Sequence, residues 1–114
     1  MLVRKKGTSE HIPVMMTGAS KVSKQITVGR ADGTPAYSMR IFTVEPGGHT
    51  PFHSHPFDHV NFVVSGSGVL VSAGGQTPVE AGDSALVLPD EMHQYRNTGS
   101  EPFVFICFVD KAYE

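Results

Sequence analysis

Residues 47–66 read GGHTPFHSHPFDHVNFVVSG, and the signals in this segment indicate how the whole chain is built. The segment begins at a Gly-Gly pair and ends at a Ser-Gly pair, and both pairs favour turns. Between these turns, residues 59–64 (HVNFVV) are rich in the aromatic and β-branched residues that favour strands. A short strand with turn residues on both sides is typical of a protein built from β-sheet.

The same pattern continues on both sides of this segment. Residues 37–44 (YSMRIFTV) predict a strand that ends at Pro46 and the Gly-Gly pair. Further strands are predicted between turns rich in Gly, Pro and Asp, over residues 25–29, 52–55, 69–73, 76–79, 84–88, 93–97 and 102–109. No stretch has the apolar period of 3.6 residues that indicates a helix. Short strands at intervals of about eight to twelve residues predict an all-β sandwich or barrel.

The N-terminal segment, residues 1–24, has mixed polarity and no clear period. We expect an N-terminal arm or an edge strand there, with residues 14–17 as the strand, because Pro13 disfavours a central position in a sheet. The strand pattern then continues over residues 37–109 without a linker or an internal repeat. The prediction is therefore one domain, 1–114, with its barrel core at about residues 37–109.

The composition excludes several classes of protein. The chain has 114 residues, 39% of them hydrophobic and 18% charged, as expected of one globular domain. A net charge of −2 argues against a nucleic-acid partner, and no apolar run reaches the roughly 18 residues that span a bilayer. The single cysteine excludes an intramolecular disulfide and a zinc site built from cysteines. The N-terminus lacks the apolar stretch of a signal peptide, so a cytoplasmic location is expected.

Six histidines stand out, and three of them lie within seven consecutive residues: His53, His55 and His59. Side chains two residues apart on an extended chain point to the same face, so His53 and His55 share a direction. His59 has the same parity, although the bend at Pro56 leaves its direction open. Imidazoles at this spacing can converge on one metal ion, about 2.0–2.2 Å from each nitrogen. A fourth ligand has to come from a distant segment, and His93, at the start of a predicted strand, is the candidate.

Histidines also occur on surfaces and in cores, where hydrogen bonds satisfy them, and this interpretation stays open. For a cluster at strand parity, flanked by Pro and Gly rather than by lysine-rich or tag-like sequence, we expect a metal site. His11 and His49 lack such surroundings and are interpreted as surface residues. Imidazole donors suit Fe, Cu, Zn and Ni and are compatible with Mn. The sequence therefore predicts one divalent transition-metal ion without selecting its identity.

The segment around the first three histidines resembles the first sequence motif of the cupin superfamily. Gly47 precedes His53 and His55 by the spacing usual in that family, and Gly66 follows His59 at the end of the motif. The family commonly has Glu at the position that His59 occupies here. The glycine and histidine spacings of the motif are otherwise present.

A second segment resembles the second cupin motif. Gly82 is followed eleven residues later by His93, and Asn97 lies four residues beyond it. Two positions depart from the family pattern, because Pro89 stands one place later than usual and Asp90 replaces the usual Gly. The spacing of the ligand-bearing position is retained.

The resemblance covers residues 37–109, and small bacterial single-domain cupins with four histidine ligands are the most similar. It implies a jelly-roll β-barrel with a metal ion near one mouth, held by His53, His55, His59 and His93. It also implies a homodimer that exchanges N-terminal strands. Because His59 replaces a carboxylate, four neutral imidazoles leave the full +2 charge of the ion, which favours anionic or enolate-like ligands. An octahedral ion would keep two positions for a chelating substrate, or for a substrate and dioxygen.

Several other residues are candidates for the pocket. Arg40 is either a solvent-facing residue or an inward cation that binds a substrate carboxylate. Phe105 and Cys107 share parity on the last predicted strand and are expected to face inward, either as packing residues or, for Cys107, as a group that modulates the metal site. Asp58 and Gln94 are neighbours of the histidines in sequence and can orient their imidazoles.

Three functions remain open. The first is an oxygenase or dioxygenase acting on a small anionic or chelating molecule, with Arg40 holding an anionic group and apolar residues excluding water. It is preferred because no carboxylate is clearly placed as a general base. The second is a lyase, isomerase or cyclase in which the metal polarises a carbonyl group. The third is a module that binds a metal or a small molecule without turnover, since the fold alone does not fix the activity.

Overall fold

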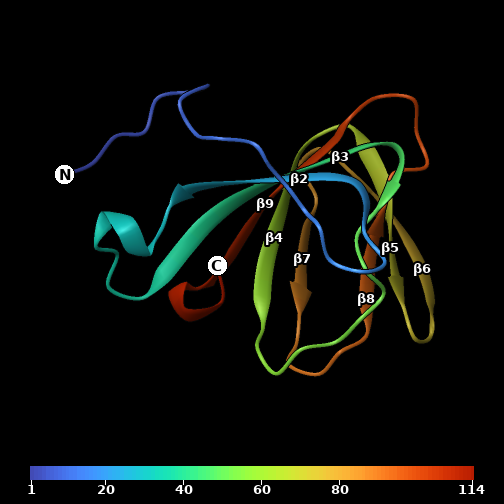
Figure 1. Ribbon diagram of the computed structural model, residues 1–114. Coiled ribbons are helices and arrows are strands. Elements are labelled where there is room, and N and C mark those ends of the chain that lie inside the picture. The colour runs from blue at the N-terminus through green and yellow to red at the C-terminus, as the bar shows by residue number, and fades with distance from the viewer.

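β-Strands form most of the structure, a computed structural model that describes all 114 residues (Figure 1). Nine strands and two short 3-10 helices follow one another along the chain: β1 (Ile12–Pro13), β2 (Ser20–Val28), η1 (Arg30–Asp32), β3 (Tyr37–His49), β4 (His59–Ser65), β5 (Ser67–Ser72), β6 (Gly75–Glu80), β7 (Ser84–Val87), β8 (His93–Arg96), β9 (Phe103–Asp110) and η2 (Lys111–Tyr113). None of the helices has the length and apolar character needed to cross a membrane. The nearly all-β content confirms the predicted fold class.

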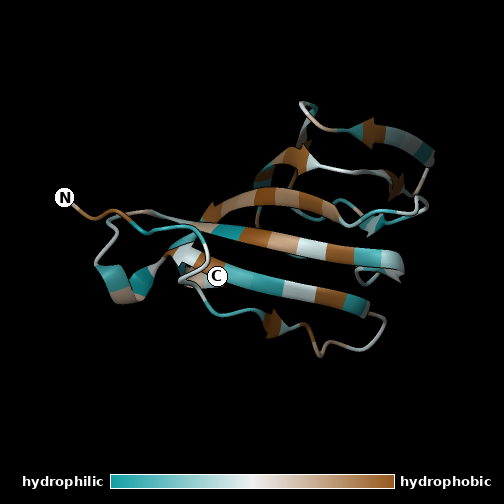
Figure 2. Cartoon of the chain, turned by 90° about the horizontal axis from the view of Figure 1, so that it is seen from above, coloured by the Kyte–Doolittle hydropathy of each residue, from teal (hydrophilic) through white to brown (hydrophobic).

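All strand pairs are antiparallel, and their order in the sheet differs from their order in the sequence. β2, β3, β9, β4 and β7 lie next to one another, and β8, β5 and β6 continue from the far end of β3, where His49 pairs with Arg96. The long strand β3 therefore belongs to both parts of the sheet. Figures 1 and 2 show how the sheet curls, so that its two parts form separate layers. This is the jelly-roll β-barrel that the sequence motifs implied.

Most observed strands agree with the predicted ones to within a few residues. β3 is longer than predicted, because it continues through Pro46 and the Gly-Gly pair to His49, and the predicted strand at residues 52–55 is not formed. The N-terminal region also differs from the prediction. β2 also includes residues 20–24, which pair with β3 and are not part of a separate arm. The edge strand lies at Ile12–Pro13 rather than at residues 14–17. The local sequence does not indicate a strand at residues 20–24, because Val22 is the only buried apolar residue in the first half of β2. Pairing with β3, which the local sequence does not show, defines this strand.

Alternating burial along the strands gives the barrel its core. On β9, Phe103, Phe105, Cys107 and Val109 are each at most 2% exposed, and the residues between them are more accessible. Hydrophobic and hydrophilic bands alternate along the strands in Figure 2. The core cluster combines side chains from five strands: Val22, Val44, Val63, Tyr95, Phe103 and Phe105. Two of these side chains, Tyr95 and Phe105, also line the interior cavity, so the core forms the floor of that cavity.

Candidate metal centre

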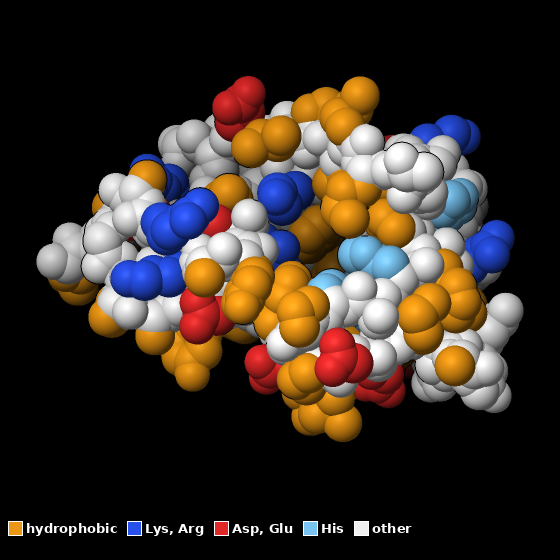
Figure 3. All heavy atoms as spheres, turned by 60° about the horizontal axis from the view of Figure 1, so that its bottom comes forward, with side chains coloured by type: hydrophobic (Ala, Val, Ile, Leu, Met, Phe, Trp, Pro, Cys, Tyr) orange, Lys and Arg blue, Asp and Glu red, His pale blue; other side chains and the backbone are white.

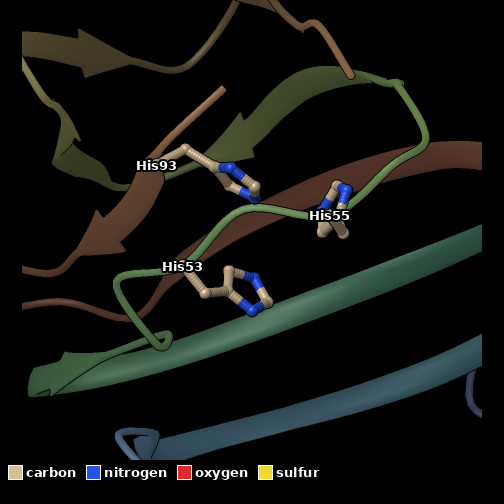
Figure 4. A group of neighbouring side chains, drawn as sticks. All are labelled: His53, His55 and His93. Carbon is tan, nitrogen blue, oxygen red and sulfur yellow. The ribbon is translucent and has the colours of Figure 1, made fainter. Parts of the chain in front are cut away.

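His53 and His93 are held together by the backbone. They form an isolated β-bridge, in which the N–H of His53 donates to the carbonyl oxygen of His93 at 3.2 Å and the reverse bond measures 2.9 Å. The predicted strand at residues 52–55 is reduced to this bridge. Ring nitrogen atoms of His53, His55 and His93 lie within 4.8 Å of one another, and Figure 4 shows the three side chains around a common space. The structure thus brings together histidines from the β3–β4 loop and from β8.

His59, the first residue of β4, lies against this cluster. Its Nε2 atom is 3.4 Å from Nε2 of His93, and its ring centroid is 5.2 Å from that of His55. Only 5% of His59 is exposed. His11 is exposed and His49 is half-buried, and both lie outside the group. The four histidines chosen from the sequence therefore meet at one place in the barrel.

The imidazoles of His55 and His93 are oriented by main-chain carbonyl groups. Nδ1 of His55 donates to the carbonyl oxygen of Phe57, and Nδ1 of His93 donates to that of Glu91, both at 2.7 Å. A carbonyl oxygen can only accept a hydrogen bond. In each neutral imidazole the proton therefore resides on Nδ1, and Nε2 carries a lone pair.

A side-chain amide has the same effect on His59. Oδ1 of Asn61 lies 2.8 Å from Nδ1 of His59 and also accepts from the hydroxyl of Tyr95 at 2.5 Å. Nδ2 of Asn61 donates to the carbonyl oxygen of Ile106 at 3.3 Å, which fixes the orientation of the amide. Nδ1 of His59 is therefore the donor, and its Nε2 is free to bind. Sequence reasoning missed Asn61 and Tyr95, and only the strand parity of Asn61 with His59 could have indicated the contact.

The facing nitrogen atoms fit a bound cation. Nε2 of His59 and Nε2 of His93 both carry lone pairs at a separation of 3.4 Å, and these repel unless a proton or a cation lies between them. Two imidazole ligands of one ion, each about 2.0–2.1 Å from it, have nitrogen atoms about 3.0–3.4 Å apart. The donor set therefore fits a divalent transition-metal ion.

The two polar residues that the sequence suggested as supports have other positions. Asp58 is exposed. Gln94 is buried, but its side chain donates to the carbonyl oxygen of Thr50 at 2.9 Å rather than to an imidazole. Side chains next to each other along a strand point to opposite faces, so a sequence neighbour of a histidine faces away from it. The supports are instead Asn61 and two main-chain carbonyl groups.

Burial lowers the pKa of three of the four histidines. Desolvation brings the pKa of His59 to about 4, although its hydrogen bond with Asn61 acts in the opposite direction. Desolvation also lowers the pKa of His53 and of His93, and charge repulsion from neighbouring imidazoles adds to the effect. These side chains are therefore neutral at pH 7 and offer lone pairs rather than positive charges.

The metal-free protein is expected to lose stability as the pH falls from about 6.5 to about 4. An unfolded histidine takes up a proton near pH 6.5, whereas folded His59 does so only near pH 4, so acid favours the unfolded state across this window. His59 alone accounts for at most about 3 kcal/mol of unfolding free energy. Urea unfolding in the presence of a chelator, for the wild type and for His59→Gln, measures the effect. An identical pH dependence in the two proteins would contradict it.

The four histidines line a cavity of about 460 Å³ inside the barrel. The structure places Arg40, Phe105 and Cys107 in the wall of the same cavity, and only 8% of Arg40 is exposed. Of the two orientations that the sequence left open for Arg40, the inward one is observed. Figure 3 shows the hollow, with histidines on one side and Lys and Arg side chains on the other. Aromatic side chains complete the wall: Phe42, Phe57, Tyr95 and Tyr113.

Solved structures with the same fold include several named proteins. The polyketide cyclase RemF from Streptomyces resistomycificus superposes with a TM-score of 0.91 at 23% identity, covering 96% of this chain and 79% of that one. A predicted oxalate decarboxylase from Thermotoga maritima gives a TM-score of 0.81 at 25% identity, covering 97% and 99%. A cupin 2 domain-containing protein from Halorhodospira halophila gives a TM-score of 0.73 at 37% identity, covering 77% and 62%. No curated protein matches the chain.

The family assignment rests on the sequence match together with this fold. The Cupin domain family matches residues 40–109, which is more than half of the chain. The matched region contains all four clustered histidines and Arg40. The family match therefore agrees with the barrel fold and with the position of the histidines inside the barrel. This chain belongs to the cupin family.

Proposed function

We propose that this cupin is a metal-dependent enzyme that binds one divalent transition-metal ion through His53, His55, His59 and His93 and acts on a small anionic or chelating molecule in the cavity. One observation carries the proposal. Fixed acceptors bind the Nδ1 protons of three imidazoles, so their Nε2 atoms are the ones available to a metal ion in the cluster. Packing or solubility alone does not require this uniform orientation. Imidazole donors suit Mn, Fe, Cu, Zn or Ni.

The reaction that we propose is oxygenation of the bound molecule. A bound transition-metal ion supplies an electrophilic centre that can also exchange electrons. Glu114 is the only carboxylate in the cavity wall, and it already accepts hydrogen bonds from the hydroxyl of Ser38 and the backbone N–H of Arg30. The hydrogen bond from Ser38 and the one from Arg30 lower the pKa of Glu114, which makes it a weak general base. Phe42 and Phe105 help to exclude water from the interior.

A second candidate is a lyase, isomerase or cyclase that uses no redox chemistry. The similarity to the polyketide cyclase, which extends over 96% of this chain with a TM-score of 0.91, favours this candidate. The histidines have the same role in both cases, because neutral imidazoles leave the positive charge of the ion available to the substrate. The cavity wall also has the same role, since it orients the substrate and excludes water.

The first experiment is elemental analysis of protein purified without a nickel column, followed by assays in air and without oxygen. Phenolic acids and diketones serve as test substrates, and oxygen uptake and product formation are measured. Fe, Mn or Cu with oxygen-dependent turnover would support an oxygenase. Zn or Ni with turnover in the absence of oxygen would support the cyclase-type reaction. Metal without any turnover would indicate a binding module, and no metal after reconstitution would overturn the proposal.

Asn61→Leu is expected to weaken metal binding by about 10- to 100-fold, because His59 loses the acceptor that orients its ring. Asn61→Asp keeps an acceptor at this position and is expected to restore most of the affinity. Competition with a chelator of known affinity gives the dissociation constants. Melting temperatures of the metal-free proteins separate this effect from loss of folding. Equal affinities of the wild type and Asn61→Leu would rule out a positioning role.

The predicted homodimer remains a proposal, supported by an apolar surface patch. The outer faces of β4, β7 and β9, together with Leu88 just after β7, present apolar side chains that are each 42–58% exposed: Val60, Phe62, Val64, Leu86, Leu88 and Phe108. Val60 pairs with Phe108 on one side and with Leu86 on the other, so the patch is continuous. A patch without charges can bury itself against a copy of itself across a two-fold axis. Light scattering is expected to give twice the mass of 12.3 kDa, and a monomer would contradict the proposal.

A further inference from the structure

The cavity contains a buried arginine that has no counter-ion. Arg40 lies on β3 with its side chain inside the barrel. The only hydrogen bond of its guanidinium group goes from Nη2 to Sγ of Cys107 at 2.8 Å, and its Nε atom is buried without a partner. Neither ion pair of the chain includes Arg40: one joins Arg4 to Asp32, and the other joins Arg30 to Glu114. A buried charge without a partner is strongly disfavoured, so a bound anion next to Arg40 would offset the cost of burying its charge.

The neighbouring side chains do not supply this anion. Burial raises the pKa of the Cys107 thiol, even though Arg40 acts in the opposite direction, so the thiol is neutral at pH 7. Glu114, the only carboxylate in the wall, forms its hydrogen bonds with Ser38 and Arg30. The compensating charge has to come from a molecule that enters the cavity.

A second cation lies in the same wall. Lys24, on β2, lines the cavity together with Arg40, and burial and the charge of Arg40 lower its pKa, although the carboxylate of Glu114 acts in the opposite direction. Figure 3 shows Lys and Arg side chains on the side of the hollow that faces the histidines. Lys24, Arg40 and the single carboxylate of Glu114 line the cavity, so basic groups outnumber acidic ones there, which favours the entry of anions.

The arginine and the histidine cluster are separated by a short distance across the sheet. Arg40, Cys107 and Asn61 are paired directly across β3, β9 and β4. Neighbouring strands lie about 4.8 Å apart, so the backbones of Arg40 and Asn61 are about 10 Å apart. Asn61 contacts His59 of the cluster. A molecule that contacts both Arg40 and the histidine cluster needs only about the length of one substituted ring or a short chain.

The wall between the two ends is aromatic. The guanidinium carbon of Arg40 lies 5.0 Å from the ring centroid of Phe42. The rings of Phe42 and Phe105 are stacked with centroids 5.4 Å apart, and those of Phe105 and Tyr95 are stacked at 4.3 Å. The ring of Tyr95 in turn lies 6.3 Å from that of His59. This row of rings favours a flat, unsaturated ligand.

We propose that Arg40 binds a carboxylate of the substrate at the end of the cavity opposite the histidines. The substrate is then a small, flat carboxylic acid that carries chelating oxygen atoms at its other end. The chelating end rests on the proposed function, whereas the carboxylate end depends on Arg40 alone. A carboxylate there would accept hydrogen bonds from the guanidinium group and compensate its charge.

Two matched probes test this subsite. 3,4-Dihydroxybenzoate has a carboxylate opposite its chelating hydroxyl groups, and 3,4-dihydroxybenzamide has a neutral amide of similar shape. Calorimetric titration of the metal-loaded and the metal-free protein is expected to show tighter binding of the acid by about 10- to 100-fold. Arg40→Met is expected to abolish this preference. Arg96→Gln, which removes the same charge from an exposed position on β8, is expected to retain it.

The outcomes separate this proposal from that of a metal-dependent enzyme. Equal binding of the two probes to the wild type, including no binding of either, would overturn the role of Arg40, and so would a preference that persists in Arg40→Met. A protein that holds no metal would contradict the proposed function, while titration of the metal-free protein still tests Arg40. Arg40→Met is expected to melt no lower than the wild type, because it replaces an unpaired buried charge with an apolar chain. Arg40→Gln serves as a second variant, with the same loss of preference expected.

Discussion

Replacing His53 by Ala is expected to reduce bound metal from about one ion per chain to less than about a tenth of that, because a site built from three or four imidazoles loses most of its affinity with one ligand. His53 is half-buried and lies in the cluster with His55 and His93. His49→Ala is the matched control, since His49 is also half-buried but lies outside the cluster. It is expected to retain the full metal content. Elemental analysis of both variants, purified without a nickel column, gives the result.

The melting temperature provides a second measurement of the same substitution. Metal at 100 times its dissociation constant stabilises the folded protein by about 2.7 kcal/mol, which His53→Ala would lose. In a domain of this size, that corresponds to roughly 10 °C or more. Addition of a chelator is expected to remove most of the difference between His53→Ala and the wild type. If the difference is the same with and without chelator, the histidine contributes only to packing.

The strands could be predicted because their signals are local. Gly, Pro and Asp residues mark the turns, and the segments between them are rich in β-branched and aromatic residues. β2 is the exception, since residues 20–24 include two lysines and two serines, and only their pairing with β3 defines them as a strand. Pairing partners distant in the sequence leave no local signal of this kind.

The histidines could be predicted for the same reason, whereas their surroundings could not. Strand parity within a short segment relates His53 to His55. The contact of His59 with Asn61 lies within β4, but the hydrogen bond from Tyr95 to Asn61 depends on how β4 and β8 face each other across the barrel. The sequence alone leaves the direction of Arg40 open, because apolar side chains occur at both odd and even positions of residues 37–44. Only the closed barrel shows which of the two faces of β3 points to the interior.

The structure also explains why Asp90 can replace the glycine usual in the second motif. Its φ is +64°, in the left-handed region, which aspartate tolerates better than most residues other than glycine. Its backbone N–H donates to the carbonyl oxygen of His55 at 2.7 Å. The turn before β8 is thereby tied to the loop that carries the first histidines. The substitution keeps the geometry that the motif requires.

Gly66, the last glycine of the first motif, has a structural role that predicts a large effect on stability. Its φ is +75°, where a side chain strains the backbone, and an added Cβ would overlap the carbonyl oxygen of Pro102. Because that oxygen belongs to the backbone at the start of β9, it cannot move away as a flexible side chain would. Gly66→Ala therefore has to shift β9 relative to the β4–β5 turn. We expect it to lower the unfolding free energy by about 3 kcal/mol or more.

Gly74→Ala is the matched control, because an added Cβ at Gly74 meets no atom within 4 Å. It is expected to change the unfolding free energy by less than about 0.5 kcal/mol. Urea unfolding of the metal-free proteins compares the two variants without a contribution from bound metal. Most small domains are stable by only about 5–15 kcal/mol, so the loss in Gly66→Ala would also reduce the folded protein available to bind metal. Similar unfolding midpoints for the two variants would show that β9 can move away from the turn, and that the glycine is not required by the fold.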